Sequence, residues 1–286
     1  MRSKKLIQLY LTNRCNSKCK TCPIWKCKEK ENLPLYKVRE FISKNKDADF
    51  VYGGGEFFLY PYYSELLSWS EKNNISYTIL TNGLLPQKVY SVIDTYAPNI
   101  TISWDGIKHD EIRGVPGNTD KIRDIVKYAR IFNAYVKLSY TFSKFNYDTI
   151  DEDMEMVKKE FGMNKVYLAL GRDSDTFANK DELIAPKDYK PLLNHLDMFY
   201  EKDVLFLKDW KKGKLPNCTS TKDVITVYSN GDIPLCQGIE SNKIWGNILN
   251  EDIDEVTKRI NNLQPVMCPF SDRCNSLCQR RYDYEV

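Results

Sequence analysis

The sequence predicts an α/β fold, an open partial barrel of parallel strands followed by a small C-terminal α+β unit. Over the first two hundred residues, short apolar runs alternate strictly with amphipathic helical patterns. Such alternation indicates parallel strands joined by right-handed crossover helices. Six strand–helix units, fewer than the eight of a closed barrel, indicate that the barrel is open. The pattern changes near Lys208, so we divide the chain into residues 1–204 and residues 205–286.

The expected strands are apolar runs, each followed by a helical pattern. They are Lys5–Thr12, Phe50–Gly53, Ile75–Thr81, Asn99–Ser103, Tyr135–Phe142 and Lys165–Leu170. Apolar residues then recur at helical spacing in Leu35–Asn45, Tyr63–Asn73, Pro86–Tyr96, Asp120–Phe132, Ile150–Phe161 and Pro186–Glu201. The carboxyl ends of parallel strands face one mouth, which is where barrels of this kind build their active sites.

The C-terminal unit has a different pattern. Val224–Tyr228 and Ile233–Cys236 flank an Asn-Gly dipeptide, which predicts a β-hairpin. Lys243–Leu249 is expected to add a strand, and Asp252–Asn262 to form a helix. The thiol-rich tail from Cys268 is too short to fold without metal.

Composition indicates a cytoplasmic protein. The net charge of the 286 residues is only +3, no nucleic-acid-binding motif is visible, and no apolar run is long enough to cross a membrane. The apolar stretch Leu6–Leu11 is too short for a signal peptide. Nine cysteines without a secretion signal indicate metal binding rather than disulfides.

Three cysteines follow the first strand at the spacing C-x3-C-x2-C, as Cys15, Cys19 and Cys22. The set is one thiolate short of a closed tetrahedral zinc site. Three thiolates suit three corners of a [4Fe–4S] cube and leave the fourth iron for another ligand. A zinc site remains the alternative. Cys27, five residues later, is either a spare buried thiol or a reactive group near the mouth.

This spacing resembles the signature of the radical S-adenosylmethionine (radical SAM) superfamily, in which SAM chelates the open iron. Gly54-Gly55-Glu56 at the end of the second strand resembles the motif that binds the methionyl amine of SAM, although Phe57 stands where proline is usual. The segment from Ser103 to Arg113 and Gly114 resembles the peptide- and sugar-modifying branch of the superfamily.

The resemblance implies roles for individual residues. Ser103 would contact the ribose or carboxylate of SAM, or else it is only a helix N-cap. Arg113 would pair with the carboxylate of SAM, or else it forms only a surface salt bridge. Asn82 either contributes to the SAM site or only turns the chain. His109 is expected on the surface, and His195 as a packing residue. The implied SAM-binding set is Thr21, Gly54, Gly55, Glu56, Asn82, Ser103, Arg113 and Leu170.

The later cysteines resemble the SPASM domain of radical SAM enzymes, in the shortened form called twitch. That form holds one auxiliary [4Fe–4S] cluster on four cysteines, whereas five are present here: Cys218, Cys236, Cys268, Cys274 and Cys278. Cys268 and Cys274 compete for the fourth place, and the spare thiol is a candidate hydrogen-atom donor. A structural zinc site on the same thiolates is the alternative.

The resemblance therefore implies a partial (βα)6 TIM-like barrel with a C-terminal iron–sulfur domain, binding two [4Fe–4S] clusters and SAM. A reduced cluster would cleave SAM to a 5′-deoxyadenosyl radical that takes a hydrogen atom from a substrate C–H bond. The electron would come from a donor such as flavodoxin or ferredoxin.

The substrate expected first is a polar small molecule (a sugar, an aminocyclitol or a nucleotide-like compound) that is oxidised or epimerised, because only one predicted strand precedes Cys15. Modification of a ribosomally made peptide and a non-catalytic zinc-binding module are the alternatives. The residues expected to line the substrate site are Tyr52, Trp104, Arg172 and Asp173.

Overall fold

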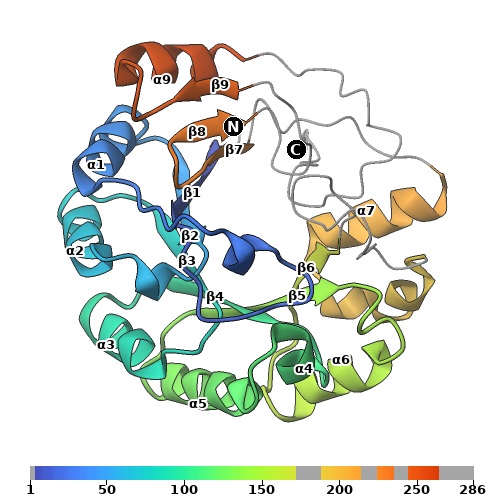
Figure 1. Ribbon diagram of the computed structural model, residues 1–286. Helices are drawn as coiled ribbons and strands as arrows, with labels where there is room; N and C mark the ends of the chain where they lie inside the picture. Colours follow the sequence, from blue (N-terminus) through green and yellow to red (C-terminus); the bar gives the residue numbers. More distant parts are fainter. Residues whose placement is uncertain (1–3, 172–187, 214–223, 235–243, 264–286) are drawn as a thin grey trace.

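The computed structural model describes residues 4–171, 188–213, 224–234 and 244–263. One parallel sheet forms its centre, with the strand order β6-β5-β4-β3-β2-β1-β7. The sheet curls, and the helices lie around its outside (Figure 1). The strands are β1 Leu6–Thr12, β2 Asp49–Gly54, β3 Tyr77–Thr81, β4 Asn99–Trp104, β5 Val136–Phe142, β6 Tyr167–Leu170 and β7 Val224–Val227. The predicted α/β partial barrel is confirmed.

Five of the helices between the strands follow the prediction to within a few residues, and the short helix His109–Arg113 was not predicted. The helices are α1 Leu35–Lys44, α2 Tyr63–Lys72, α3 Pro86–Tyr96, α4 His109–Arg113, α5 Asn118–Ile131 and α6 Ile150–Lys159. Two short 3-10 turns, η1 Ile24–Lys26 and η2 Phe57–Leu59, follow β1 and β2.

The hydrophobic core lies between the sheet and its helices. In β1, Ile7, Leu9 and Leu11 are fully buried, whereas Gln8 and Tyr10 are half-buried. This alternation follows from the period of two in a strand, because successive side chains point to opposite faces. One face of each strand therefore packs on helices, and the other faces the inside of the curl.

The C-terminal part differs from the prediction at β7. Val224–Val227 does not pair with the following strand in a hairpin but joins the main sheet, parallel to β1. All four of its residues are buried, as is typical of a strand in a parallel sheet covered on both faces. The predicted turn is present: Gly231 has φ +86° and its amide donates to the carbonyl of Tyr228.

Two short strands, β8 Asp232–Pro234 and β9 Ile244–Asn247, pair antiparallel, and α9 Ile253–Asn261 follows. Helix α9 packs beside α1, where the Asn45 amide donates to Thr257 Oγ1 at 3.3 Å. The surface pair Lys44–Asp254 joins the same two helices at 2.6 Å.

The predicted helix Pro186–Glu201 is wrong in detail. In its described part, a 3-10 helix, η3 Lys190–Met198, contains the non-helical residue His195, and α7 Glu201–Lys211 begins after an extended Phe199. Pro191 at the start and the kink at His195 interrupt a continuous α-helix. Helix α7 spans the proposed boundary at residue 205. No helix within the described parts of the chain is long and apolar enough to cross a membrane.

Candidate functional site

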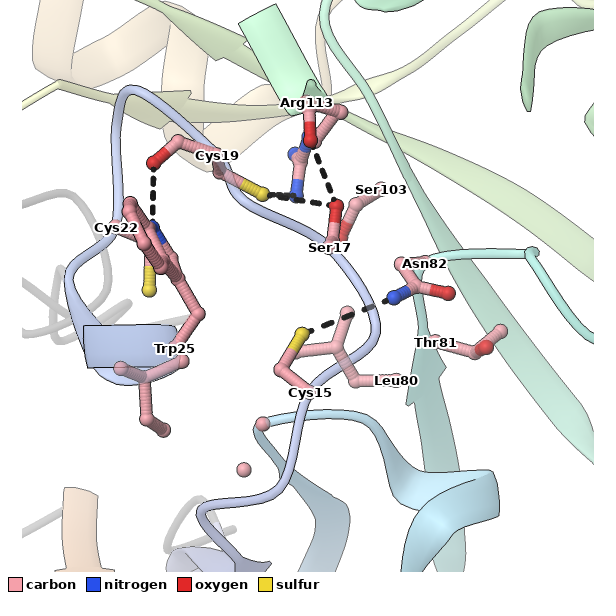
Figure 2. A pocket seen from close by; sticks show the side chains of 13 residues that line it. Cys15, Ser17, Cys19, Cys22, Trp25, Leu80, Thr81, Asn82, Ser103 and Arg113 are labelled. Carbon is pink, nitrogen blue, oxygen red and sulfur yellow. Dashed lines mark hydrogen bonds between the residues drawn. The ribbon is translucent and has the colours of Figure 1, made fainter. Parts of the chain in front are cut away.

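Three thiols surround one pocket at the carboxyl ends of the strands (Figure 2). Cys15, Cys19 and Cys22 lie on the loop after β1, and the ends of β2, β3 and β4 complete the walls. The other lining residues are Ser17, Ile24, Trp25, Gly54, Gly55, Leu80, Thr81, Asn82, Ser103 and Arg113. The structure thus brings together the cysteine motif, both motif glycines and three further residues predicted from sequence.

The metal-ligating residues on the pocket walls are the three cysteines. Among the described residues, no three Cys, His, Asp or Glu side chains form a group that could hold one metal ion. A cubic cluster needs no such convergence, because each thiolate binds a different iron. Burial raises the pKa of Cys15 and of Cys22 to about 11, so the free thiols are protonated at neutral pH. A bound cationic iron would favour the thiolate form.

Polar hydrogens also face the sulfur atoms. The Asn82 side-chain amide lies 3.9 Å from Cys15 Sγ, and Arg113 Nη1 lies 3.8 Å from Cys19 Sγ. Such donors stabilise thiolates, which supports the assignment of these cysteines as iron ligands.

The two motif glycines let the end of β2 approach the cysteine loop. A Cβ on Gly54 would lie 2.3 Å from the Thr12 carbonyl oxygen, and one on Gly55 would lie 2.2 Å from that of Arg14. The space is instead used by backbone hydrogen bonds, from the Gly55 amide to Thr12 at 2.7 Å and from the Glu56 amide to Arg14 at 2.8 Å. Only glycine allows this contact.

Glu56 is buried beside the pocket but is not one of the lining residues. Its carboxylate accepts hydrogen bonds from Thr81 Oγ1 at 2.7 Å, the Asn82 amide at 2.7 Å and the Phe58 amide at 3.2 Å. Burial raises its pKa, and these bonds oppose that rise. The carboxylate thus fixes the end of β3, while its contact with the amine of SAM stays a prediction.

Arg113 is engaged differently from the prediction. Its guanidinium Nε and Nη2 donate to both carboxylate oxygens of Asp105, the latter at 2.9 Å. Asp105 is fully buried, so this is an internal pair and not the surface salt bridge of the alternative interpretation. The fork that was expected to receive the SAM carboxylate is occupied by Asp105.

Two predicted substrate residues are wrong. Tyr52 is fully buried and shares a 2.9 Å hydrogen bond with Ser70 of α2, so it faces the helix layer. Trp104 is fully buried against Tyr140 and Phe161. Trp104 ends β4 and Tyr52 lies two residues before the end of β2, and neither side chain lines the pocket.

The histidine predictions meet mixed outcomes. His109 is buried, not on the surface: its Nδ1 accepts from the Asp105 amide at 3.0 Å, and its Nε2 lies 2.8 Å from Asn118 Nδ2. Burial lowers its pKa to about 4, so the ring is neutral at pH 7. His195 lies 2.6 Å from Asp151, outside the pocket.

The remaining predicted residues do not line the pocket or lie outside the described residues. Thr21 is half-buried and Leu170 is buried at the end of β6, and neither lines the pocket. Cys27 is exposed, which contradicts the buried alternative. Those outside the described residues are Arg172, Asp173, Cys218, Cys236, Cys268, Cys274 and Cys278.

Sequence reasoning missed several lining residues, Trp25 among them. Its indole N–H donates to the Cys19 carbonyl at 3.2 Å, which closes the cysteine loop. An aromatic residue three positions after the third cysteine was the available signal. The alternation of side chains along a strand could have identified Leu80 as a lining residue, since it lies one residue before the end of β3 and on its half-buried face.

The sequence matches the family model of the radical SAM superfamily over residues 9–157. Among curated proteins it is 24% identical over 287 residues to the antilisterial bacteriocin subtilosin biosynthesis protein AlbA of Bacillus subtilis, covering 92% of this chain and 62% of AlbA. It is 22% identical to the radical SAM cyclopropyl synthase TigE of Paramaledivibacter caminithermalis, covering 96% of this chain and 67% of TigE. The chain thus spans about two thirds of these relatives.

Solved structures share the fold. Streptococcus suis SuiB bound to S-adenosylmethionine superposes with a TM-score of 0.68 at 17% identity, covering 91% of this chain and 68% of SuiB. Native anSMEcpe with bound AdoMet and the Cp18Cys peptide gives a TM-score of 0.70 at 17% identity, covering 96% of this chain and 84% of that one. The family match spans more than half of the 286 residues and includes the cysteine loop and both motif glycines. This chain therefore belongs to the radical SAM superfamily.

Proposed function

We propose that this protein is a radical SAM enzyme that modifies a ribosomally synthesised peptide. The observation that carries the catalytic part is the pocket with Cys15, Cys19 and Cys22 on its walls. The peptide substrate is supported by AlbA, a bacteriocin biosynthesis protein, and by a SuiB structure bound to the precursor peptide SuiA. These relatives support the peptide alternative better than the polar small molecule expected first.

The proposal gives each wall of the pocket a role. Cys15, Cys19 and Cys22 hold a [4Fe–4S] cluster, and the backbone of Gly54 and Gly55 leaves room for SAM against the strand ends. When bound and reduced, the cluster supplies the electron that cleaves SAM into methionine and a 5′-deoxyadenosyl radical able to take a substrate hydrogen atom.

Polar residues at the carboxyl ends of β3 and β4 complete the SAM site. Asn82 and Ser103 present side chains at the pocket wall and would bind polar groups of SAM. The indole of Trp25 forms part of the same wall and helps to exclude water, which would protect a radical from quenching.

The C-terminal assignments belong to the same proposal. Four of the five later cysteines would hold an auxiliary [4Fe–4S] cluster in a twitch-like domain of residues 205–286, and Cys274 or Cys268 would be the spare thiol and possible hydrogen donor. Cytoplasmic flavodoxin or ferredoxin would supply electrons. Whether the net reaction is an oxidation, an epimerisation or a bond formation depends on this part.

The test uses the full chain with a candidate substrate. Anaerobically reconstituted protein is incubated with SAM, dithionite and each short precursor peptide encoded beside its gene, synthesised with deuterium in place of carbon-bound hydrogen. We expect one peptide to change mass and to transfer deuterium to 5′-deoxyadenosine. Label transfer from a deuterated sugar or aminocyclitol, with every peptide unchanged, would overturn the peptide substrate.

A further inference from the structure

The guanidinium of Arg113 lies between a buried carboxylate and a cluster cysteine. Two of its nitrogens bind both oxygens of Asp105, and the third, Nη1, faces Cys19 Sγ at 3.8 Å. The Arg113 side chain is 12% exposed and that of Asp105 is fully buried. Figure 2 shows Arg113 directed at Cys19 from across the loop.

Asp105 is itself fixed on both sides. Its amide donates to His109 Nδ1 at 3.0 Å, and its carbonyl accepts from the Asn146 side chain at 3.0 Å. His109 in turn lies 2.8 Å from the Asn118 side chain of α5. The carboxylate that orients Arg113 is therefore anchored by elements outside the SAM pocket.

The main chain of the same helix end fixes the cysteine loop. The carbonyl of Arg113 accepts from the Lys18 amide at 3.1 Å and from the Ser17 hydroxyl at 3.0 Å. The Lys20 amide donates to the Ile112 carbonyl at 2.8 Å. These bonds tie the cysteine loop to the helix end that carries Arg113, so the fold sets the distance between the guanidinium and Cys19.

A fixed cation at this position has an electrostatic consequence. The guanidinium is permanently charged, and a partly desolvated charge acts more strongly than one in water. A positive charge near a cluster sulfur stabilises the reduced cluster, which carries one more electron. The negative charge of Asp105 opposes this effect. Charge and hydrogen bonding at the sulfurs are known determinants of cluster potential.

We propose that Arg113 and Asp105 form a potential-setting pair for the cluster on Cys15, Cys19 and Cys22, in which Arg113 raises the reduction potential and Asp105 limits that rise. Arg113 is then a positioning residue acting through Cys19 and not a ligand of SAM. The inference rests on the proposed function, because it needs the cluster to be present.

The test is an EPR-monitored redox titration of the reconstituted full chain without SAM, following the signal that changes when SAM is added to a parallel sample. In Arg113→Gln we expect the ratio of reduced to oxidised cluster at a fixed potential to fall at least tenfold, a negative shift of at least about 59 mV for a one-electron couple. Asp105→Asn should shift the potential in the opposite direction.

Lys20→Gln is the matched control. It removes the same formal charge next to Cys19, but from an exposed side chain that pairs with Glu111 at 2.6 Å. Its potential should stay near that of the unmodified protein. Arg113→Lys keeps the charge, so its reduction potential should lie closer to that of the unmodified protein than the potential of Arg113→Gln does. This variant can still be measured if Arg113→Gln does not bind iron.

Three outcomes would overturn the inference. The first is an equal reduction potential in Arg113→Gln and Lys20→Gln, and the second is a shift of the same sign in Arg113→Gln and Asp105→Asn. The third applies where Arg113→Gln lacks iron, and it is an unchanged potential in Asp105→Asn. Weaker SAM binding by Arg113→Gln at an unchanged potential would make Arg113 the SAM ligand predicted from sequence. By contrast, unmodified protein with no cluster dependent on Cys15, Cys19 and Cys22 would refute the proposed function itself.

Discussion

Glu56 ends the glycine motif with its carboxylate turned to the end of β3. Three donors reach its two oxygens, from Thr81, Asn82 and Phe58. Because Asn82 also lines the pocket, this carboxylate connects the glycine motif to the wall of the SAM site. A residue chosen for ligand binding by resemblance thus has a structural role that the sequence did not reveal.

We expect Glu56→Gln to lower the free energy of unfolding by about 1–3 kcal/mol, because the new amide nitrogen would face a buried donor. SAM binding should weaken with it, since the Asn82 backbone loses its acceptor. Urea unfolding and a SAM-binding titration measure the two effects. Glu65→Gln, on the exposed face of α2, is the control, and equal stability of the two variants would contradict this role.

The substrate predictions for Tyr52 and Trp104 failed for a reason that is also local. Both residues were chosen because they end strands, but in a strand the face alternates with each residue. Ser103, one position before Trp104, is half-buried and lines the pocket, whereas Trp104 packs against the helix layer. The sequence therefore predicted which residues lie near the mouth. To predict which side chains face the pocket, one must also know which alternate residues of each strand point inward.

At the level of elements, the contact between β2 and the cysteine loop decides the shape of the pocket. We expect Gly55→Ala to reduce SAM cleavage about 100-fold, because its Cβ would displace the backbone at Arg14 and a misplacement near 1 Å costs that much. The added Cβ would lie only 2.2 Å from the Arg14 oxygen. Iron content and 5′-deoxyadenosine formation are the measurements.

Gly53→Ala is the matched control for this prediction. It lies two residues earlier, on β2, where an added Cβ would approach no closer than 3.5 Å, to Leu80. That distance is an ordinary van der Waals contact, so this variant should retain iron and activity. Equal activity of the two variants would show that the close approach at Gly55 is dispensable.

Asp153 of α6 joins that helix to the turn after β4. Its carboxylate accepts from Tyr140 Oη at 2.6 Å, the Ile107 amide at 2.7 Å and Thr149 Oγ1 at 3.1 Å. Burial raises its pKa from 3.8 to about 6. The folded state therefore holds the proton of Asp153 more tightly than the unfolded chain does. As a result, the contribution of Asp153 to the free energy of unfolding is greatest below pH 4 and declines as the pH rises to about 6.

We expect this group to remove about 2 kcal/mol of stability between pH 4 and pH 6. Asp153→Asn should lack that part of the decline, which denaturant unfolding at several pH values would measure. Asp124→Asn changes an exposed carboxylate of α5 and should keep the full decline. Parallel stability curves for Asp153→Asn and the unmodified protein would exclude Asp153 as the source.

For the whole molecule, the periodicity of apolar residues was enough to predict the barrel but not the pairing of every strand. Each strand from β1 to β6 overlaps its predicted range, because a buried parallel strand is a local apolar run. The partner of β7 was predicted wrongly, since a nearby Asn-Gly turn favours a hairpin and sequence does not show the open edge of β1. Likewise, the burial of His109 depends on α4 packing against α5.

The candidate site was predictable where motifs carry spacing information. Cys15, Cys19, Cys22 and both glycines were found because their residue types suit the chemistry at that spacing. The pairing of Arg113 with Asp105 was not predicted from the sequence. The Asp105 carboxylate reaches the Arg113 guanidinium only once the turn after β4 has formed, and it then occupies the nitrogens that a ligand carboxylate would use.

The central claim is that Cys15, Cys19 and Cys22 hold the cluster that cleaves SAM, and one measurement tests it most directly. Iron content and 5′-deoxyadenosine formation are compared between the reconstituted full chain and the variant with all three cysteines changed to alanine. We expect about eight irons in the unmodified protein, about four in the variant, and no SAM cleavage by the variant. Zinc in place of iron, or undiminished SAM cleavage by the variant, would contradict the claim.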